Sequence, residues 1–105
     1  MLRVAQHATG NGMIGGFRHK GLRQLYENGD RSKVPQAMVA RIERVLAALD
    51  AATELADLSN PSFRLHELKG DRAETWSIRV TGNWRITFRI GEPFEPTDVD
   101  LEDYH

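Results

Sequence analysis

Apolar residues in the first half of the chain recur at helical spacing. Between Gly21 and Gly29 they lie three and four residues apart, and Asn28-Gly29 is a suitable helix end. A second, amphipathic helix of about four turns is predicted to begin at Pro35, with apolar positions at Met38, Ile42, Val45, Leu46 and Leu49. Residues 51–58 are expected to add another turn, and residues 14–19 are a candidate strand.

After Pro61 the apolar period changes to two. Apolar and polar residues alternate over residues 63–66, 76–81 and 84–90, and Val99 with Leu101 predicts a final strand. Such alternation is typical of half-buried strands with one apolar face. Because helices come first and antiparallel strands follow, the predicted fold class is α+β, with N-terminal helices packed on one face of a small antiparallel sheet.

The residues Thr81-Gly82-Asn83 are predicted to form the turn between the second and third strands. Val80 and Trp84 must both lie on the apolar face, so we expect them to pair across a three-residue loop. Within this loop, Gly82 or Asn83 is free to adopt a positive φ.

The same register gathers cations on the uncovered face of the sheet. Arg79 lies opposite Arg85, where like charges repel, Arg89 lies further along this face, and His66 projects from the preceding strand. Phosphate would relieve the repulsion by accepting paired guanidinium hydrogen bonds. Alternatively, the acidic end of the chain lies against these arginines, and the two arrangements are compatible.

The net charge of −1 conceals an uneven distribution. Residues 13–89 hold 13 Lys and Arg against 9 Asp and Glu, whereas residues 90–105 hold six acids and no Lys or Arg. A basic body is compatible with a polyanionic partner, but a solvated surface balanced by its tail accounts for the same numbers. Charge alone therefore leaves the partner open.

The length of 105 residues suits one domain, which we place at residues 13–105. Residues 1–12 end in a turn-prone stretch and lack the apolar segment of a secretory signal, so we interpret them as a flexible N-terminal extension outside the fold. The chain has no cysteine, which excludes disulfides and fits a reducing cytosol. No apolar run approaches the ~18 residues of a membrane span.

Cleavage of RNA without a metal ion is a reaction that histidine, lysine and arginine side chains can carry out together. The 2′-OH attacks the neighbouring phosphorus, which requires a base, an acid for the departing 5′-oxygen and cations for the phosphate. His66 and His105 can divide the proton transfers, and Lys69, Arg79 and Arg85 are available for the phosphate.

A zinc site formed by His66, Asp103 and His105 is the alternative based on a metal. The sequence has no zinc-like ligand spacing, and the arginines would repel a cation, so we expect no metal and no cofactor. Motifs for a serine nucleophile or a phosphate-binding loop do not occur in the chain either.

Three segments carry a resemblance to a known family: MIGGFRHKGLRQLYENGDRSKVP, RLHELKGDRAETWSIRVTGNWRITF and the terminal EDYH. Together they resemble the HigB-type host-growth-inhibition toxins, a branch of the RelE/ParE toxin superfamily, over residues 13–105. The resemblance implies a RelE-like fold, a cytoplasmic location and ribosome-dependent endoribonuclease activity that cuts mRNA and inhibits translation. It also implies a partner, a HigA-type antitoxin with a helix-turn-helix domain. The toxin is then expected to reach operator DNA only in complex with this antitoxin, and no membrane partner is expected.

The resemblance also implies site residues. Its catalytic positions fall on His66, Lys69, Arg85, Asp103, Tyr104 and His105. The register adds Arg79 as an RNA contact, and Arg72 and Arg89 are further arginines expected to bind RNA. An adjacent carboxylate favours the charged form of His105, so we expect His66 to be the base, with the reverse assignment open.

Two departures from the family pattern affect these expectations. Residues 1–12 have no recognised counterpart. The turn at residues 91–96 is proline-rich and slightly longer than the family pattern, which bears on the direction of the final strand and so on the placement of His105. Two alternative functions use the same fold or the same basic face: a non-catalytic ParE-like inhibitor of DNA gyrase, and an RNA-binding module that does not cleave.

Overall fold

Two α-helices form where the apolar spacing predicts them. In the computed structural model, which describes residues 13–103, α2 spans Lys20–Asn28 and α3 spans Val39–Ala51. The backbone N–H of Leu22 donates to Nδ1 of His19 at 3.1 Å, which caps the start of α2. Gly29, with a φ of 71°, ends the helix in a left-handed conformation. The predicted helix end at Asn28-Gly29 is therefore confirmed.

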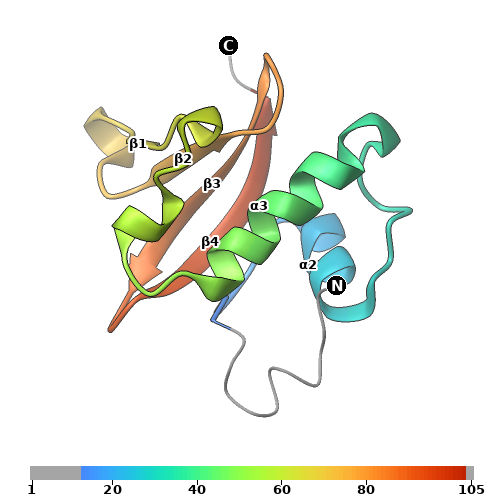
Figure 1. Ribbon diagram of the computed structural model, residues 1–105, viewed down its shortest axis with the longest axis horizontal. Helices are drawn as coiled ribbons and strands as arrows, with labels where there is room; N and C mark the ends of the chain where they lie inside the picture. Colours follow the sequence, from blue (N-terminus) through green and yellow to red (C-terminus); the bar gives the residue numbers. More distant parts are fainter. Residues whose placement is uncertain (1–12, 104–105) are drawn as a thin grey trace.

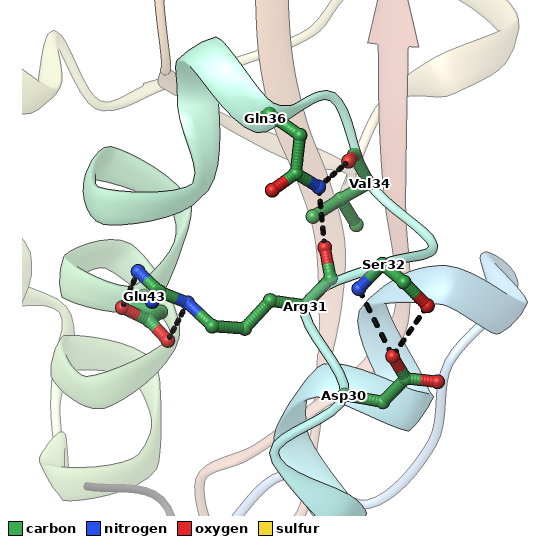
Figure 2. Close-up of polar contacts among 6 residues, drawn as sticks. All are labelled: Asp30, Arg31, Ser32, Val34, Gln36 and Glu43. Atoms are coloured by element: carbon green, nitrogen blue, oxygen red, sulfur yellow. Dashed lines mark hydrogen bonds and ion pairs between the residues drawn. The ribbon is translucent and has the colours of Figure 1, made fainter.

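The loop between the helices is closed by polar side chains (Figure 2). Asp30 Oδ1 accepts from the backbone N–H and the hydroxyl of Ser32 at 2.9 and 2.6 Å. Gln36 Nε2 donates to the carbonyl of Arg31 at 2.7 Å, and the Arg31 guanidinium lies 3.4 Å from Glu43 of α3. This loop leads into the 3₁₀ turn η1 (Gln36–Met38), which continues directly into α3. Pro35 thus precedes the first turn, with its φ of −60° suited to that place.

Asp50 near the end of α3 ties the start of the described chain to α2. Its Oδ1 accepts from the hydroxyl of Tyr26 and, at 3.0 Å, from the backbone N–H of Met13. Burial, followed by the hydrogen bond with Asp50, raises the pKa of Tyr26, so the phenol stays protonated. A further 3₁₀ turn, η2 (Leu55–Leu58), supplies the predicted extra turn, separated from α3 by extended backbone at Ala52.

The sheet lies on one side of α2 and α3, with its strands in chain order β1-β2-β3-β4 and every neighbouring pair antiparallel (Figure 1). Its strands are β1 (His66–Glu67), β2 (Trp76–Arg79), β3 (Trp84–Gly91) and β4 (Glu95–Asp103). Apolar side chains of β2, β3 and β4 are buried in one core with those of α2 and α3, among them Ile78, Ile86, Phe88 and Val99. The predicted α+β class, with helices on one face of an antiparallel sheet, is confirmed.

The hairpin between β2 and β3 has the predicted register but not the predicted backbone. Arg79 lies opposite Arg85, and the carbonyl of Trp84 accepts from the N–H groups of Val80 and Thr81 at 2.8 and 3.1 Å. Neither residue at the tip, Gly82 or Asn83, is among those with a positive φ, so that expectation was wrong. Two amides sharing one carbonyl close this loop without a left-handed residue.

The strand predicted over residues 63–66 was largely wrong. Asn60 Oδ1 accepts from the backbone N–H of Ser62 at 2.9 Å, and this contact starts the 3₁₀ turn η3 (Pro61–Phe63). Arg64 then adopts a φ of 48°, which interrupts an extended chain. Only His66 and Glu67 pair with β2. The apolar–polar alternation at 63–66 therefore reflects a turn whose Phe63 side chain is buried.

The last strand begins earlier than predicted and contains a bulge. Thr87 lies opposite Asp100 but Arg89 lies opposite Thr97, so β4 has one residue more than β3 in this interval, and Asp98 has a φ of 53°. The candidate strand at residues 14–19 is reduced to a single parallel bridge between Phe17 and Val99.

Between residues 13 and 103, no helix combines the length and the apolar character needed to cross a bilayer.

Candidate functional site

A groove of about 340 Å³ lies at the hairpin end of the uncovered sheet face, over β1, β2 and β3. It is lined by Arg64, His66, Ser77, Arg79, Thr81, Gly82, Trp84 and Arg85. The register explains the assembly: His66 lies opposite Ser77, and Arg79 lies opposite Arg85, so alternation places all four on one face. Three residues expected in the site, His66, Arg79 and Arg85, are thereby brought to one groove.

The backbone of Arg64 orients the imidazole of His66. Nδ1 of His66 lies 3.1 Å from the carbonyl oxygen of Arg64, whose left-handed conformation directs this carbonyl toward the ring. A proton on Nδ1 makes it the donor in this contact and leaves Nε2 as a hydrogen-bond acceptor. This tautomer has the form that a general base requires.

Positive charge extends beyond the groove onto α3. The Arg41 guanidinium donates to the backbone carbonyls of Ser62 and Arg79 at 2.7 and 2.9 Å and lies over the ring of Phe63, 5.1 Å from its centre. Burial lowers the pKa of Arg41, and the nearby charges of Arg44 and Arg79 lower it further. Arg41 therefore joins η3 to the end of β2 and adds to the cationic surroundings of Arg79.

Glu102 of β4 is the acid that lies among these arginines. It is the cross-strand neighbour of Arg85, and its two oxygens accept from the Arg72 guanidinium at 2.8 and 2.6 Å. The Thr87 hydroxyl donates to Glu102 Oε2 at 2.5 Å. These hydrogen bonds, that of Arg72 first, hold the pKa of Glu102 at about 2. One acid of the chain's acidic end, Glu102, thus lies beside Arg85 on the arginine face, as one of the two open arrangements expected of the whole acidic end.

Other expected site residues lie outside the groove lining. Lys69 is exposed and directly precedes the 3₁₀ turn η4 (Gly70–Arg72). Arg89 is exposed and lies 3.4 Å from Glu74. Asp103 lies opposite Trp84, so alternation places it on the other side of β4 from Glu102. Tyr104 and His105 lie outside the described residues.

No group of three His, Asp or Glu side chains within residues 13–103 is arranged to hold a metal ion. The zinc alternative also needs His105, which lies beyond that part of the chain.

Three residues of this face were not predicted from the sequence: Glu102, Arg64 and Ser77. Ser77 was detectable, because it alternates with Trp76 and Ile78 and so shares the polar face with Arg79.

Comparison with known proteins gives two agreeing results. Residues 15–105 match the family described as the RelE-like toxin of type II toxin–antitoxin system HigB. The chain is also 47% identical over 95 residues to the Endoribonuclease HigB of Proteus vulgaris, an alignment that covers 89% of this chain and 100% of that protein. The chain therefore belongs to the family of HigB-type, RelE-like toxins of type II toxin–antitoxin systems.

Proposed function

We propose that this toxin is an endoribonuclease that cuts mRNA on the ribosome and so inhibits translation. The observation that carries the proposal is the groove in which His66 lies with Arg79 and Arg85 on the uncovered sheet face. The relative from Proteus vulgaris is named an endoribonuclease, and its alignment covers most of the present chain. An oriented imidazole beside two guanidinium groups supplies a base and phosphate ligands.

In the proposed reaction, Nε2 of His66 removes the proton from a ribose 2′-OH. The 2′-oxygen forms a bond to the adjacent phosphorus, and the bond from phosphorus to the 5′-oxygen breaks, which gives a 2′,3′-cyclic phosphate and a free 5′-hydroxyl. Arg79 and Arg85 bind the phosphate oxygens as negative charge develops. His105, which follows Asp103 and Tyr104 in the sequence, supplies the proton for the leaving 5′-oxygen. No metal ion takes part in this sequence.

The surrounding residues stabilise charge and bind RNA in this proposal. Lys69, in the loop before η4, stabilises the negative charge that develops on the phosphate. Arg89 binds the RNA backbone further along the face. Tyr104 stacks on a base.

Membership of a type II system implies an antitoxin partner for the chain. We propose that this antitoxin is a HigA-type helix-turn-helix protein and that the toxin reaches operator DNA only within their complex. The ribosome and mRNA are the other proposed partners, and the proposed site of action is the cytoplasm.

The test is inducible expression followed by mapping of 5′ ends on cellular mRNA, with His66→Gln as the matched variant. We expect growth arrest and cuts only in translated messages, because the proposed substrate is mRNA on the ribosome. The His66→Gln variant should lose activity on the order of 10²–10⁴-fold, as for loss of a general base. Growth arrest with intact messages and DNA damage would favour gyrase inhibition. RNA binding without new 5′ ends would favour the non-cleaving module.

A further inference from the structure

The carboxylate of Glu102 connects three segments that are distant in sequence. It belongs to β4, binds the hydroxyl of Thr87 on β3, and binds both terminal nitrogens of Arg72 in η4, thirty residues away. The Glu102 side chain is 22% exposed and that of Arg72 is 43% exposed. A bidentate, partly buried contact of this kind fixes geometry more firmly than an exposed pair.

Arg72 attaches the tip of the loop between β1 and β2 to the sheet through its contact with Glu102 on β4. The base of this loop is closed by the hydrogen bond from Leu68 N–H to the carbonyl of Thr75 at 2.8 Å. Its tip contains Lys69 and Gly70, and Gly70 has a φ of 69°. Fixing Arg72 therefore fixes the short turn that begins immediately after Lys69.

Glu102 is also the residue directly before Asp103, the first of the three C-terminal residues in the proposed reaction. The same carboxylate thus attaches the Lys69 loop to the segment that leads into the C-terminal residues. The second ion pair on this face differs in kind, because Arg89 meets Glu74 at 3.4 Å through one contact and the Glu74 side chain is 79% exposed.

We propose that Glu102 is a positioning residue, whose bidentate contact with Arg72 holds the Lys69 loop and the end of β4 in one fixed arrangement. The proposal rests on the proposed endoribonuclease function, and it assigns the guanidinium of Arg72 to Glu102 instead of to RNA. Glu102 itself touches no substrate in this scheme. It acts through the placement of Lys69 and of Asp103, the residue that follows Glu102 in β4.

The kinetic test uses full-length variants on ribosomes programmed with a defined mRNA. For Glu102→Gln and Arg72→Ala, we expect the cleavage rate at saturating toxin to fall roughly 10- to 100-fold, as for a misplaced catalytic group, with little change in the half-saturating concentration. The double variant should lose no more than either single one, because both remove the same contact. Glu74→Gln, in the exposed pair, is the matched control and should cleave like the parent.

Arg72→Lys separates positioning from RNA binding. Lysine keeps the charge but loses the two-pronged guanidinium, so the variant should remain impaired if Arg72 serves Glu102. A raised half-saturating concentration at an unchanged maximal rate, restored by Arg72→Lys, would overturn the proposal and make Arg72 an RNA contact.

Hydrogen exchange gives a reading that does not depend on cleavage. In Glu102→Gln, the amides of Leu68, Ala73 and Thr75 should exchange several-fold faster while β3 amides stay protected, because only the loop loses its attachment. Unchanged exchange in the loop would also overturn the proposal. If the parent protein fails to cut mRNA, the endoribonuclease proposal falls, and this exchange measurement still decides whether Glu102 orders the loop.

Discussion

Arg85 is the residue on which opposing electrostatic effects meet. Its cross-strand neighbours are Arg79 on β2, which repels it, and Glu102 on β4, which attracts it. Because these effects offset each other, Arg85→Ala should change the melting temperature little. Cleavage should fall on the order of 10²-fold through the loss of a phosphate ligand. Thermal melting and ribosomal cleavage assays check this, and a large drop in melting temperature with normal cleavage would make Arg85 a structural residue.

The lowered pKa of Glu102 predicts how the free energy of unfolding changes at acid pH. Its pKa is about 2 in the folded protein against an ordinary value of 4.5, chiefly because Arg72 donates to it. The lowered pKa means that the charged form stabilises the fold above about pH 4.5, and this contribution is lost as the pH falls toward about 2. The unfolding free energy of the parent should therefore decline more steeply across this window than that of Glu102→Gln. Parallel denaturation curves for the two proteins would contradict the expectation.

At the scale of elements, two glycines provide a matched comparison. Gly29 has a φ of 71° at the end of α2, whereas Gly82 lies in the β2–β3 turn without a positive φ, and a Cβ at either position would meet open space. Gly29→Ala should destabilise the protein by about 1 kcal/mol through backbone strain alone. Gly82→Ala should be neutral or stabilise it by up to about 1 kcal/mol, because the unfolded chain loses freedom. Chemical denaturation measures both, and equal losses would show that the turn also needs glycine.

Helices and strands in which apolar residues recur at a regular spacing over many positions were predictable from the sequence. Segments whose backbone conformation depends on a single side-chain contact were not. The β2–β3 register followed from alternation, because Val80 and Trp84 had to share a face. Residues 63–66 have the same alternation, but the Asn60 contact to Ser62 and the left-handed Arg64 replaced most of the strand by a turn. A side-chain cap of this kind competes locally with strand pairing and leaves no periodic signal.

At the scale of the whole molecule, the candidate site was predictable only where it rests on neighbouring strands. His66, Arg79 and Arg85 were placed on one face from alternation and one turn length. The position of Glu102 depends on the bulge in β4, which shifts the register between Thr87 and Arg89 and has no signature in the apolar pattern. The Arg72–Glu102 contact joins positions thirty residues apart, so local sequence could not reveal it.

The extent of the domain gives a last test, because residues 1–12 were predicted to lie outside it. A chain that begins at Met13 would place a charged amino group at the nitrogen that lies 3.0 Å from Asp50 Oδ1. Charge-assisted hydrogen bonds are stronger than neutral ones, so the shortened protein should melt at the same temperature as the full chain or higher. Asp50→Asn in both chains is the control, and it should remove any gain from the new charge. Mapped mRNA cuts should also stay the same, since the groove uses no residue before Arg64. A clear decrease in melting temperature or in cleavage in the shortened protein would show that residues 1–12 belong to the functional domain.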